Sequence, residues 1–325
     1  MRILFIGGTK FVGRWMVDAA LAANHEVTLF HRGKTNTDIF PEVEHRIGDR
    51  DSDLSSLNEG TWDAVIDTSG YTPKQVHRMA ELLKDRVETY TFISTVSVYD
   101  DPVRAGADEN APLKKLSEDA GDEVTGATYG ALKVLAERAL DEVFEGRVLH
   151  IRPGLVVGPH DPTDRFTYWV DRLYRGGEVL VPGKPEKRVQ FIDARDLGEF
   201  TVKLTAQKTH GYYNATGPGF PLTWGRWMDI FKEAFKNDVR LTWVNDTFLE
   251  QQPLKGNEFP FWVPEPYDGL LAIDTRKAIS AGLTFRPLHD TIQDTFQWDQ
   301  SRERDQLNAG LSSKEESHLL KSWHG

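Results

Sequence analysis

Residues 2–13 read Arg-Ile-Leu-Phe-Ile-Gly-Gly-Thr-Lys-Phe-Val-Gly, an apolar run that ends in glycines. The run 3–6 is typical of a buried strand, and apolar residues at helical spacing over 11–23 predict a helix directly after it. A glycine turn between a strand and a helix presents backbone N–H groups and the positive end of the helix at one point. The turn therefore indicates a pyrophosphate site for a dinucleotide, with contacts expected from Gly7, Thr9, Lys10, Phe11, Val12 and Gly13.

The turn departs from the usual fingerprint at one position. That fingerprint has three spaced glycines, and Lys10 stands where the middle one is expected. The place of the turn, after the first strand and at the start of a helix, still favours cofactor binding. Gly13 is expected to let the helix pack closely against the strand. An ordinary strand-to-helix turn is the alternative.

Strand and helix patterns alternate over residues 1–158, which we interpret as a dinucleotide-binding domain. Further strands are predicted at 26–30, 43–47, 63–67, 89–94 and 148–151, with helices at 73–85 and 127–143. This alternation predicts an α/β fold, a doubly wound Rossmann sheet of parallel strands. Ligands of such sheets lie at the carboxyl ends of the strands.

The pattern loosens after residue 158. We expect a smaller substrate lobe over 159–300, interleaved with segments at about 189–215 that return to the Rossmann domain. Helices are predicted at 163–175, 194–207, 223–236, 274–281 and 288–300, and a short strand pair from 211–214 and 239–244. The tail 301–325 is polar and predicts a peripheral helix or a flexible end.

Composition narrows the function classes. The chain has no cysteine, which excludes disulfides, thiolate nucleophiles and cysteine-based metal sites. Its net charge of −11 and lack of dense basic runs disfavour nucleic acid as a partner. The scattered histidines show no ligand spacing, so no metal site is expected. Short apolar runs and the missing export signal predict a cytoplasmic protein without a membrane span.

The ends of the second and third strands suggest which dinucleotide binds. His31 and Arg32 follow the second strand, where an NAD site typically carries an acidic residue for the ribose 2′-hydroxyl. Arg32 can instead pair with a 2′-phosphate, which favours NADP over NAD. Asp49 and Arg50 follow the third strand, where a carboxylate can accept from the adenine amine. Solvated loop cations and a surface turn are the alternatives.

A second group of residues predicts proton chemistry. Tyr129 and Lys133 are four apart in a helical pattern and so share one face. An ammonium near a phenol lowers its pKa and makes it a usable acid and base, and the lysine can also hold ribose hydroxyls. Thr95 follows the fifth strand and can hydrogen-bond a substrate oxygen. A half-buried aromatic and a capped strand end are the alternatives.

These motifs together resemble a known family. The segments GGTKFVG (7–13), ISTVSVY (93–99), YGALK (129–133), IRPGLVVGP (151–159) and VQFIDARDL (189–197) are similar to those of an extended short-chain dehydrogenase/reductase of the NAD-dependent epimerase/dehydratase group. The resemblance implies that Thr95, Tyr129 and Lys133 are catalytic. It also implies further contacts to the cofactor from Thr68, Ser69, Gly70 and Pro153.

Two departures from the family pattern bear on the substrate rather than on the fold. Lys10 replaces a glycine, and Asp67-Thr-Ser-Gly70 replaces a His-x-Ala-Ala segment. Both are similar to an atypical branch with a GGTxFxGR loop, matched here through Arg14. That branch includes reductases and plastid relatives reported to bind RNA.

We therefore predict Tyr-assisted hydride transfer at a carbinol or carbonyl carbon of a small molecule, either a sugar or a sugar nucleotide. Net reduction, epimerisation and dehydration all remain open. The alternative is a non-catalytic, cofactor-bound regulator or RNA-associated protein on the same fold. Arg188, His160 and Trp169 are candidate substrate contacts, although each residue type more often serves structure. The resemblance also implies a homodimer.

Overall fold

The computed structural model describes residues 1–117, 119–254 and 256–325. Its main sheet contains β1 (Arg2–Ile6), β2 (Glu26–His31), β3 (Glu44–Ile47), β4 (Trp62–Asp67), β5 (Val87–Ile93), β6 (Val148–Pro153) and β10 (Gly211–Ala215). All neighbours are parallel, in the order β10-β6-β5-β4-β1-β2-β3. The predicted doubly wound Rossmann sheet is confirmed, with β10 added at one edge.

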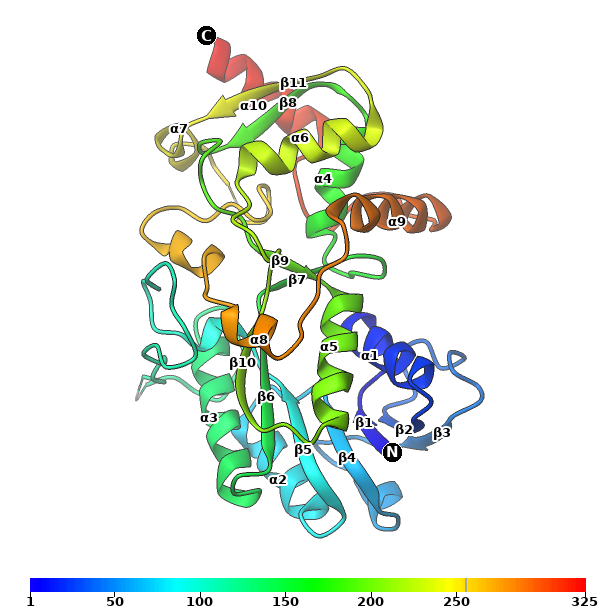
Figure 1. Ribbon diagram of the computed structural model, residues 1–325. Helices are drawn as coiled ribbons and strands as arrows, with labels where there is room; N and C mark the ends of the chain where they lie inside the picture. Colours follow the sequence, from blue (N-terminus) through cyan, green and yellow to red (C-terminus); the bar gives the residue numbers. More distant parts are fainter. Residues whose placement is uncertain (118, 255) are drawn as a thin grey trace.

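Helices cover both faces of this sheet (Figure 1). α1 (Phe11–Ala22) and α5 (Ala194–Ala206) pack together on one face, and α2 (Pro73–Leu83) and α3 (Tyr129–Val143) on the other. Ile3 and Phe5 belong to the core under α1, whereas Leu4 and Ile6 belong to the core under α2 and α3. Because successive strand residues point to opposite, equally buried faces, the whole run 3–6 is apolar.

A second lobe stands beyond the carboxyl ends of the strands (Figure 1). It contains α4 (Arg165–Tyr174), β8 (Gly177–Pro182), α6 (Trp224–Phe235), β11 (Val239–Val244), α7 (Asp246–Glu250), α9 (Leu288–Ser301) and α10 (Ser313–His324). Its core combines aliphatic side chains with a cluster of aromatic rings. Trp224 lies 5.2 Å, between ring centroids, from both Trp169 and Trp227. Such tilted ring pairs add to the free energy of apolar burial.

The remaining short elements lie in the segments that connect the larger helices and strands. They are η1 (Ser55–Leu57), η2 (Val96–Val98), β7 (Leu155–Val157), β9 (Phe191–Asp193), η3 (Tyr267–Leu271) and α8 (Arg276–Ser280). β7 pairs with β9 in a small parallel ribbon. The segment 194–215 then returns to the Rossmann sheet, with α5 on its face and β10 at its edge.

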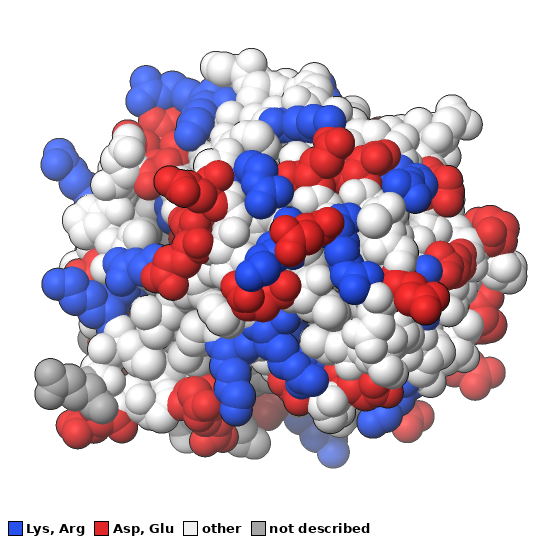
Figure 2. All heavy atoms as spheres, turned by 90° about the horizontal axis from the view of Figure 1, so that it is seen from below, with Lys and Arg blue, Asp and Glu red and all other residues white. Residues whose placement is uncertain are grey.

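The surface at the lower end of the molecule carries charges of both signs. Figure 2 shows Lys and Arg side chains interspersed with Asp and Glu over this face. Among the described residues drawn there, basic side chains form no continuous patch. Separately, no helix in the described part of the chain combines the length and the apolar composition needed to cross a bilayer.

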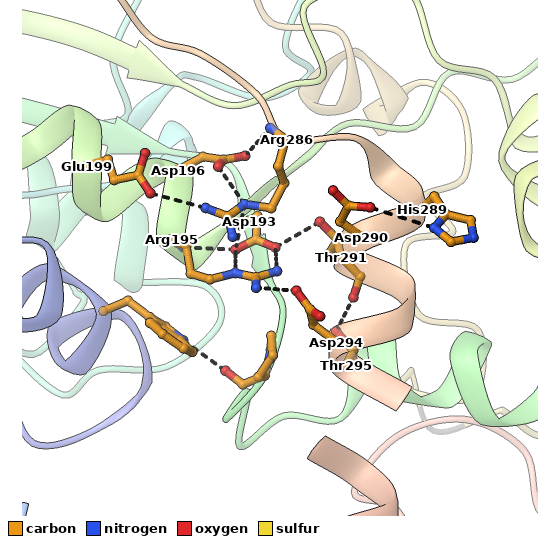
Figure 3. A network of polar contacts seen from close by, with 12 residues as sticks. Asp193, Arg195, Asp196, Glu199, Arg286, His289, Asp290, Thr291, Asp294 and Thr295 are labelled. Atoms are coloured by element: carbon orange, nitrogen blue, oxygen red, sulfur yellow. Dashed lines mark hydrogen bonds and ion pairs between the residues drawn. The ribbon is translucent and has the colours of Figure 1, made fainter. Parts of the chain in front are cut away.

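A network of charged residues joins the lobes (Figure 3). Asp193 caps α5 and binds Arg195, with 2.8 Å between Oδ2 and Nη2. Thr291 of α9 donates to the same carboxylate at 2.8 Å, and Arg195 also pairs with Asp294 of α9. The Asp193 side chain is therefore shared between a helix of the sheet and a helix of the second lobe.

The predicted strand pair of 211–214 and 239–244 is wrong. Residues 211–215 form β10, which pairs with β6 in the main sheet. Residues 239–244 form β11, which pairs with β8. Strand propensity identified both segments, but their partners are fixed by tertiary packing, and β8 was not predicted.

The tail ends in a helix rather than in a flexible segment. Ser312 and Glu315 form a capping box at the start of α10. Glu316 is buried against Arg172, with 2.6 Å between Oε2 and Nε, and it accepts from the Leu180 amide at 3.1 Å. Leu319 belongs to the hydrophobic core of the second lobe. α10 is therefore an integral part of the second lobe.

We predict that Glu316→Ala lowers the free energy of unfolding of this lobe by about 3 kcal/mol, because Arg172 would remain buried without its carboxylate. Denaturant unfolding followed by tryptophan fluorescence measures the change. Lys321→Ala, at an exposed position of the same helix, is the control. Equal unfolding curves for the two variants would show that the ion pair does not stabilise the lobe.

Candidate active site

A cavity of about 520 Å³ lies at the carboxyl ends of β1, β2 and β4. Its wall includes most of the expected cofactor residues, namely Gly7, Thr9, Lys10, Phe11, Val12, Gly13, His31, Arg32, Asp49, Arg50, Thr68 and Ser69. Residues that the sequence did not single out also line it, namely Ile6, Gly8, Phe30, Lys34, Thr35, Gly48, Asp51, Tyr71, Gln75 and Pro162. Pro162 comes from the second lobe, which only the fold brings to this place.

The glycine turn has the geometry that a pyrophosphate requires. Gly7 and Gly8 have φ values of 103° and 98°, which favour glycine. A Cβ on Gly13 would lie 2.9 Å from the Gly8 amide nitrogen, so the helix packs closely as predicted. Lys10 is extended, at φ −135°, and its side chain does not cap α1. A glycine is therefore not needed at Lys10. The Gly13 amide donates to the Lys10 carbonyl at 3.1 Å, so the amides of Phe11 and Val12 are the ones that can face an anion.

His31 lies at the cavity wall, but its ring nitrogens are engaged within the protein. The Gly33 amide donates to Nδ1 at 3.1 Å, so Nε2 carries the hydrogen and donates to Nδ1 of His45 at 2.8 Å. Burial and the charge of His45 lower the pKa of His31. The ring is therefore a neutral part of the wall, and Arg32 beside it is exposed.

Arg50 lines the cavity and is at the same time the buried partner of Asp67, so its role toward a cofactor stays a prediction. Its two terminal nitrogens each lie 2.9 Å from a carboxylate oxygen of Asp67. Asp67 also accepts from the Ser69 amide at 3.0 Å and from the Tyr90 hydroxyl at 2.8 Å. Burial alone would raise the pKa of Asp67, but Arg50 and these hydrogen bonds hold it below its ordinary value.

Lys133 is fully enclosed at the end of β5. Its Nζ donates to the carbonyl oxygen of Ile93 at 2.6 Å. The same atom lies 4.4 Å from the centre of the Phe92 ring and 5.5 Å from that of Tyr71. Burial lowers the pKa of Lys133 to about 7, against the charge of Asp67, which raises it. The amine is therefore poised between its two protonation states near neutral pH.

Tyr129 and Thr95 lie close together because the start of α3 packs against η2. Tyr129 is the first residue of α3, and Thr95 caps η2 by accepting from the Ser97 amide at 3.1 Å. A Cβ on Gly130 would lie 2.0 Å from the Ser97 carbonyl oxygen, so only glycine allows this approach. The Thr95 hydroxyl hydrogen-bonds with Tyr129. Its oxygen already accepts from Ser97, which leaves its hydrogen free to donate.

The pKa of Tyr129 is raised, first by burial, while the hydrogen bond with Thr95 and the charge of Arg165 act in the opposite direction. The predicted lowering by Lys133 is wrong in this arrangement, because the ammonium is bonded to the carbonyl of Ile93 instead. A phenol with a raised pKa keeps its proton at neutral pH. Tyr129 is therefore suited to donate a proton to a substrate oxygen.

The three expected substrate contacts lie in different surroundings. Arg188 is exposed, and its side chain makes no hydrogen bond or ion pair with the described residues. His160 packs between Trp15 and Trp298, with centroid distances of 5.8 and 5.4 Å. Trp169 is fully buried and donates to the Pro260 carbonyl. Trp169 is therefore core, which corrects its assignment, and His160 is mainly a packing residue.

Three expected cofactor residues lie outside the cavity wall. Lys133 is behind the Tyr71 ring, Pro153 ends β6 in a buried position, and Gly70 packs against Val76. A Cβ on Gly70 would lie 2.6 Å from Cγ2 of Val76. These residues shape the floor behind the cavity.

Comparisons with known proteins show the family and the fold of the chain. A sequence profile of the NAD dependent epimerase/dehydratase family matches residues 3–215. The chain belongs to this family. A curated family relative is the chloroplast stem-loop binding protein of 41 kDa b from Arabidopsis thaliana, 32% identical over 215 residues. The match covers 60% of this chain and 53% of that relative, about half of its length.

Solved structures share the fold of this family member. Pal from Bacillus thuringiensis is 19% identical with a TM-score of 0.65, and the match covers 93% of this chain and 99% of Pal. The UDP-glucuronic acid 4-epimerase from Bacillus cereus, solved in complex with NAD, is 17% identical with a TM-score of 0.66, over 92% of this chain and 99% of that enzyme. At these identities the likeness shows the fold alone.

We predict that Gly130→Ala lowers turnover by at least about tenfold. The added methyl group would push α3 away from the turn that carries Thr95. A shift of about 1 Å at a reacting group has an effect of this order. Gly126→Ala is the matched control, since a Cβ there would meet no atom within 4 Å. Initial rates of both variants, with dinucleotide affinity measured in parallel, test the prediction. Equal rates would contradict it.

Proposed function

We propose that this protein is an NAD(P)-dependent enzyme of the epimerase/dehydratase family that acts on a carbinol or carbonyl carbon of a sugar or sugar nucleotide. One observation carries the proposal: Tyr129, whose pKa burial raises, hydrogen-bonds with Thr95, and both stand in the same motif order as the buried Lys133 one helical turn further along α3. The UDP-glucuronic acid 4-epimerase, with its NAD complex, supports the cofactor class and suggests the substrate class.

A bound nicotinamide would supply or accept the hydride. The Gly7–Gly8 turn and the free amides of α1 would hold the pyrophosphate, and Asp49 at the cavity wall would accept from the adenine amine. Tyr129 donates its proton to the substrate oxygen, or takes it back in the reverse direction. The Thr95 hydroxyl orients that oxygen. Lys133 donates to the Ile93 carbonyl and so ties α3, which begins at Tyr129, to the end of β5, which Thr95 follows.

We further propose that NADP is preferred over NAD. Arg32 follows β2 at the cavity wall, and Lys10 and Lys34 line the same cavity. The residue of β2 that precedes Arg32 is His31, which is held neutral, so no carboxylate stands there for a ribose 2′-hydroxyl. Arg188, exposed and unpaired among the described residues, is a candidate for a substrate phosphate.

A second candidate function rests on the similarity to the Arabidopsis relative, a stem-loop binding protein. On that reading the chain would bind structured RNA and use its dinucleotide only as a structural or regulatory ligand. The net charge of −11 and the mixed charges of the face in Figure 2 weigh against it.

We predict that Tyr129→Phe lowers turnover on the order of 10²–10⁴-fold, because the proton donor is lost, while dinucleotide affinity changes little. Tyr174→Phe, at an exposed site of the second lobe, is the control. Sugar nucleotides are assayed with NADPH and NADP. Net NADPH consumption identifies a reductase, and product without net consumption identifies an epimerase or a dehydratase.

The same variant separates the two candidate functions. The RNA-associated function would be favoured by two results together. The native chain and Tyr129→Phe would both bind a stem-loop RNA in a salt-dependent way, and neither would turn over any sugar nucleotide. Failure of the native chain to bind either dinucleotide would contradict both.

We predict that Arg32→Glu weakens NADP binding by about 10- to 100-fold and leaves NAD binding within a few fold, since a charge-assisted pair with the 2′-phosphate contributes about 1.5–3 kcal/mol. Lys74→Glu, exposed on α2, controls for the change in net charge. Isothermal titration with each dinucleotide is the measurement. Native protein that binds NAD as tightly as NADP would refute the preference.

A further inference from the structure

Tyr71 is an aromatic residue held in an exposed position at the cavity. It is 45% exposed and lines the cavity wall. Its backbone is fixed directly before α2, because its amide donates to Oε1 of Gln75 at 3.1 Å and Thr72 and Gln75 form a capping box. A Cβ on the preceding Gly70 would lie 2.8 Å from the Phe92 ring. The segment is therefore pressed against β5 and not free to move away.

The ring of Tyr71 lies against the buried amine of Lys133. The centre of the ring is 5.5 Å from Nζ, within the range of a cation–π contact. Nζ also lies 4.4 Å from the centre of the Phe92 ring and 2.6 Å from the Ile93 carbonyl oxygen. Phe92 is fully buried, whereas Tyr71 faces the cavity. Of the two rings beside the amine, Tyr71 is thus the one that also lines the cavity.

We propose that Tyr71 is a positioning residue of the site, whose ring seals Lys133 from the cavity and holds its amine against the Ile93 carbonyl. The lysine is only 3% exposed although the cavity lies beside it. A ligand group that approaches the amine from the cavity meets this ring first. The relevance of Tyr71 to turnover rests on the proposed function, but its contact with Lys133 does not.

Several charged groups act on Lys133 from the surrounding elements. Burial is the largest influence and lowers its pKa. Asp67 of β4 and Glu137 of α3 raise the pKa, and Arg50 lowers it. Arg50 and Asp67 form a closed pair, so their effects oppose each other. Of the influences on the pKa of Lys133, a single substitution at Tyr71 changes most the access of water to the amine.

The ring also belongs to the surroundings of the proton donor. Tyr71 is among the groups that raise the pKa of Tyr129. The Tyr71 side chain, which lines the cavity, therefore affects both Lys133 and Tyr129. This is a place where the chain departs from the family pattern, since residues 67–70 replace the usual His-x-Ala-Ala segment.

The experiment titrates Lys133 in the ligand-free protein. Lysine is labelled with ¹³C at Cε, the Lys133 signal is assigned by its loss in Lys133→Met, and its chemical shift is followed from pH 5 to pH 10. Native protein is compared with Tyr71→Ala, Tyr71→Leu and Tyr71→Phe. Tyr267→Ala removes a similarly exposed tyrosine elsewhere, 51% against 45%, and is the control. Thermal unfolding of each variant checks that it is folded, and Tyr71→Ser replaces Tyr71→Ala if that variant is not.

We expect Tyr71→Ala to raise the pKa of Lys133 by at least about one unit, because water then stabilises the ammonium. Tyr71→Phe keeps the ring and should titrate like the native protein. Tyr71→Leu keeps the bulk without the π face, so its pKa should stay equal or fall. An unchanged pKa in Tyr71→Ala, or the same rise in Tyr267→Ala, would overturn the inference. Native protein that binds no dinucleotide would refute the proposed function and leave this result standing.

Discussion

The carboxylate of Asp67 lies fully buried at the end of β4 and accepts hydrogen bonds from Arg50, Ser69 and Tyr90. It thereby ties the turn after β3, the end of β4 and the neighbouring β5 into one unit. Removing one partner of such a buried pair costs about 3–5 kcal/mol, because the other charge stays buried. The cavity floor rests on this unit, and so does the charge balance around Lys133. The chemistry proposed for the site depends on this one ion pair staying closed.

Local signals made the first half of the site predictable from sequence. The glycine turn fixes its own backbone, so Gly7 and Gly13 could be placed without knowledge of the fold. Lys10 looked like a departure, but its extended backbone needs no glycine, and Gly8 supplies the second positive φ. The continuous apolar run 3–6 indicated a strand buried on both faces, and the sheet confirms it.

The errors arose where the outcome depends on partners far away in sequence. Trp169 was expected to contact a substrate, but the rings and aliphatic side chains that enclose it come from distant parts of the chain, which the local sequence cannot reveal. The pKa of Tyr129 was expected to fall because Lys133 is one helical turn away. The amine instead binds the Ile93 carbonyl of another element, and burial dominates the phenol. Tyr71 carried no motif at all, and only the packing of β4 and α2 reveals its position.

The junction at Asp193 limits how the molecule can open. Swinging α9 away from α5 would separate Asp193 from Thr291 and Arg195 from Asp294. A buried carboxylate would lose a donor in the process, so a wide hinge movement is costly. Entry to the cavity is then left to segments at its rim, such as the turn that carries Pro162. The rate at which a bound dinucleotide exchanges should therefore be set by local motion of a short loop and not by a hinge opening between the two lobes.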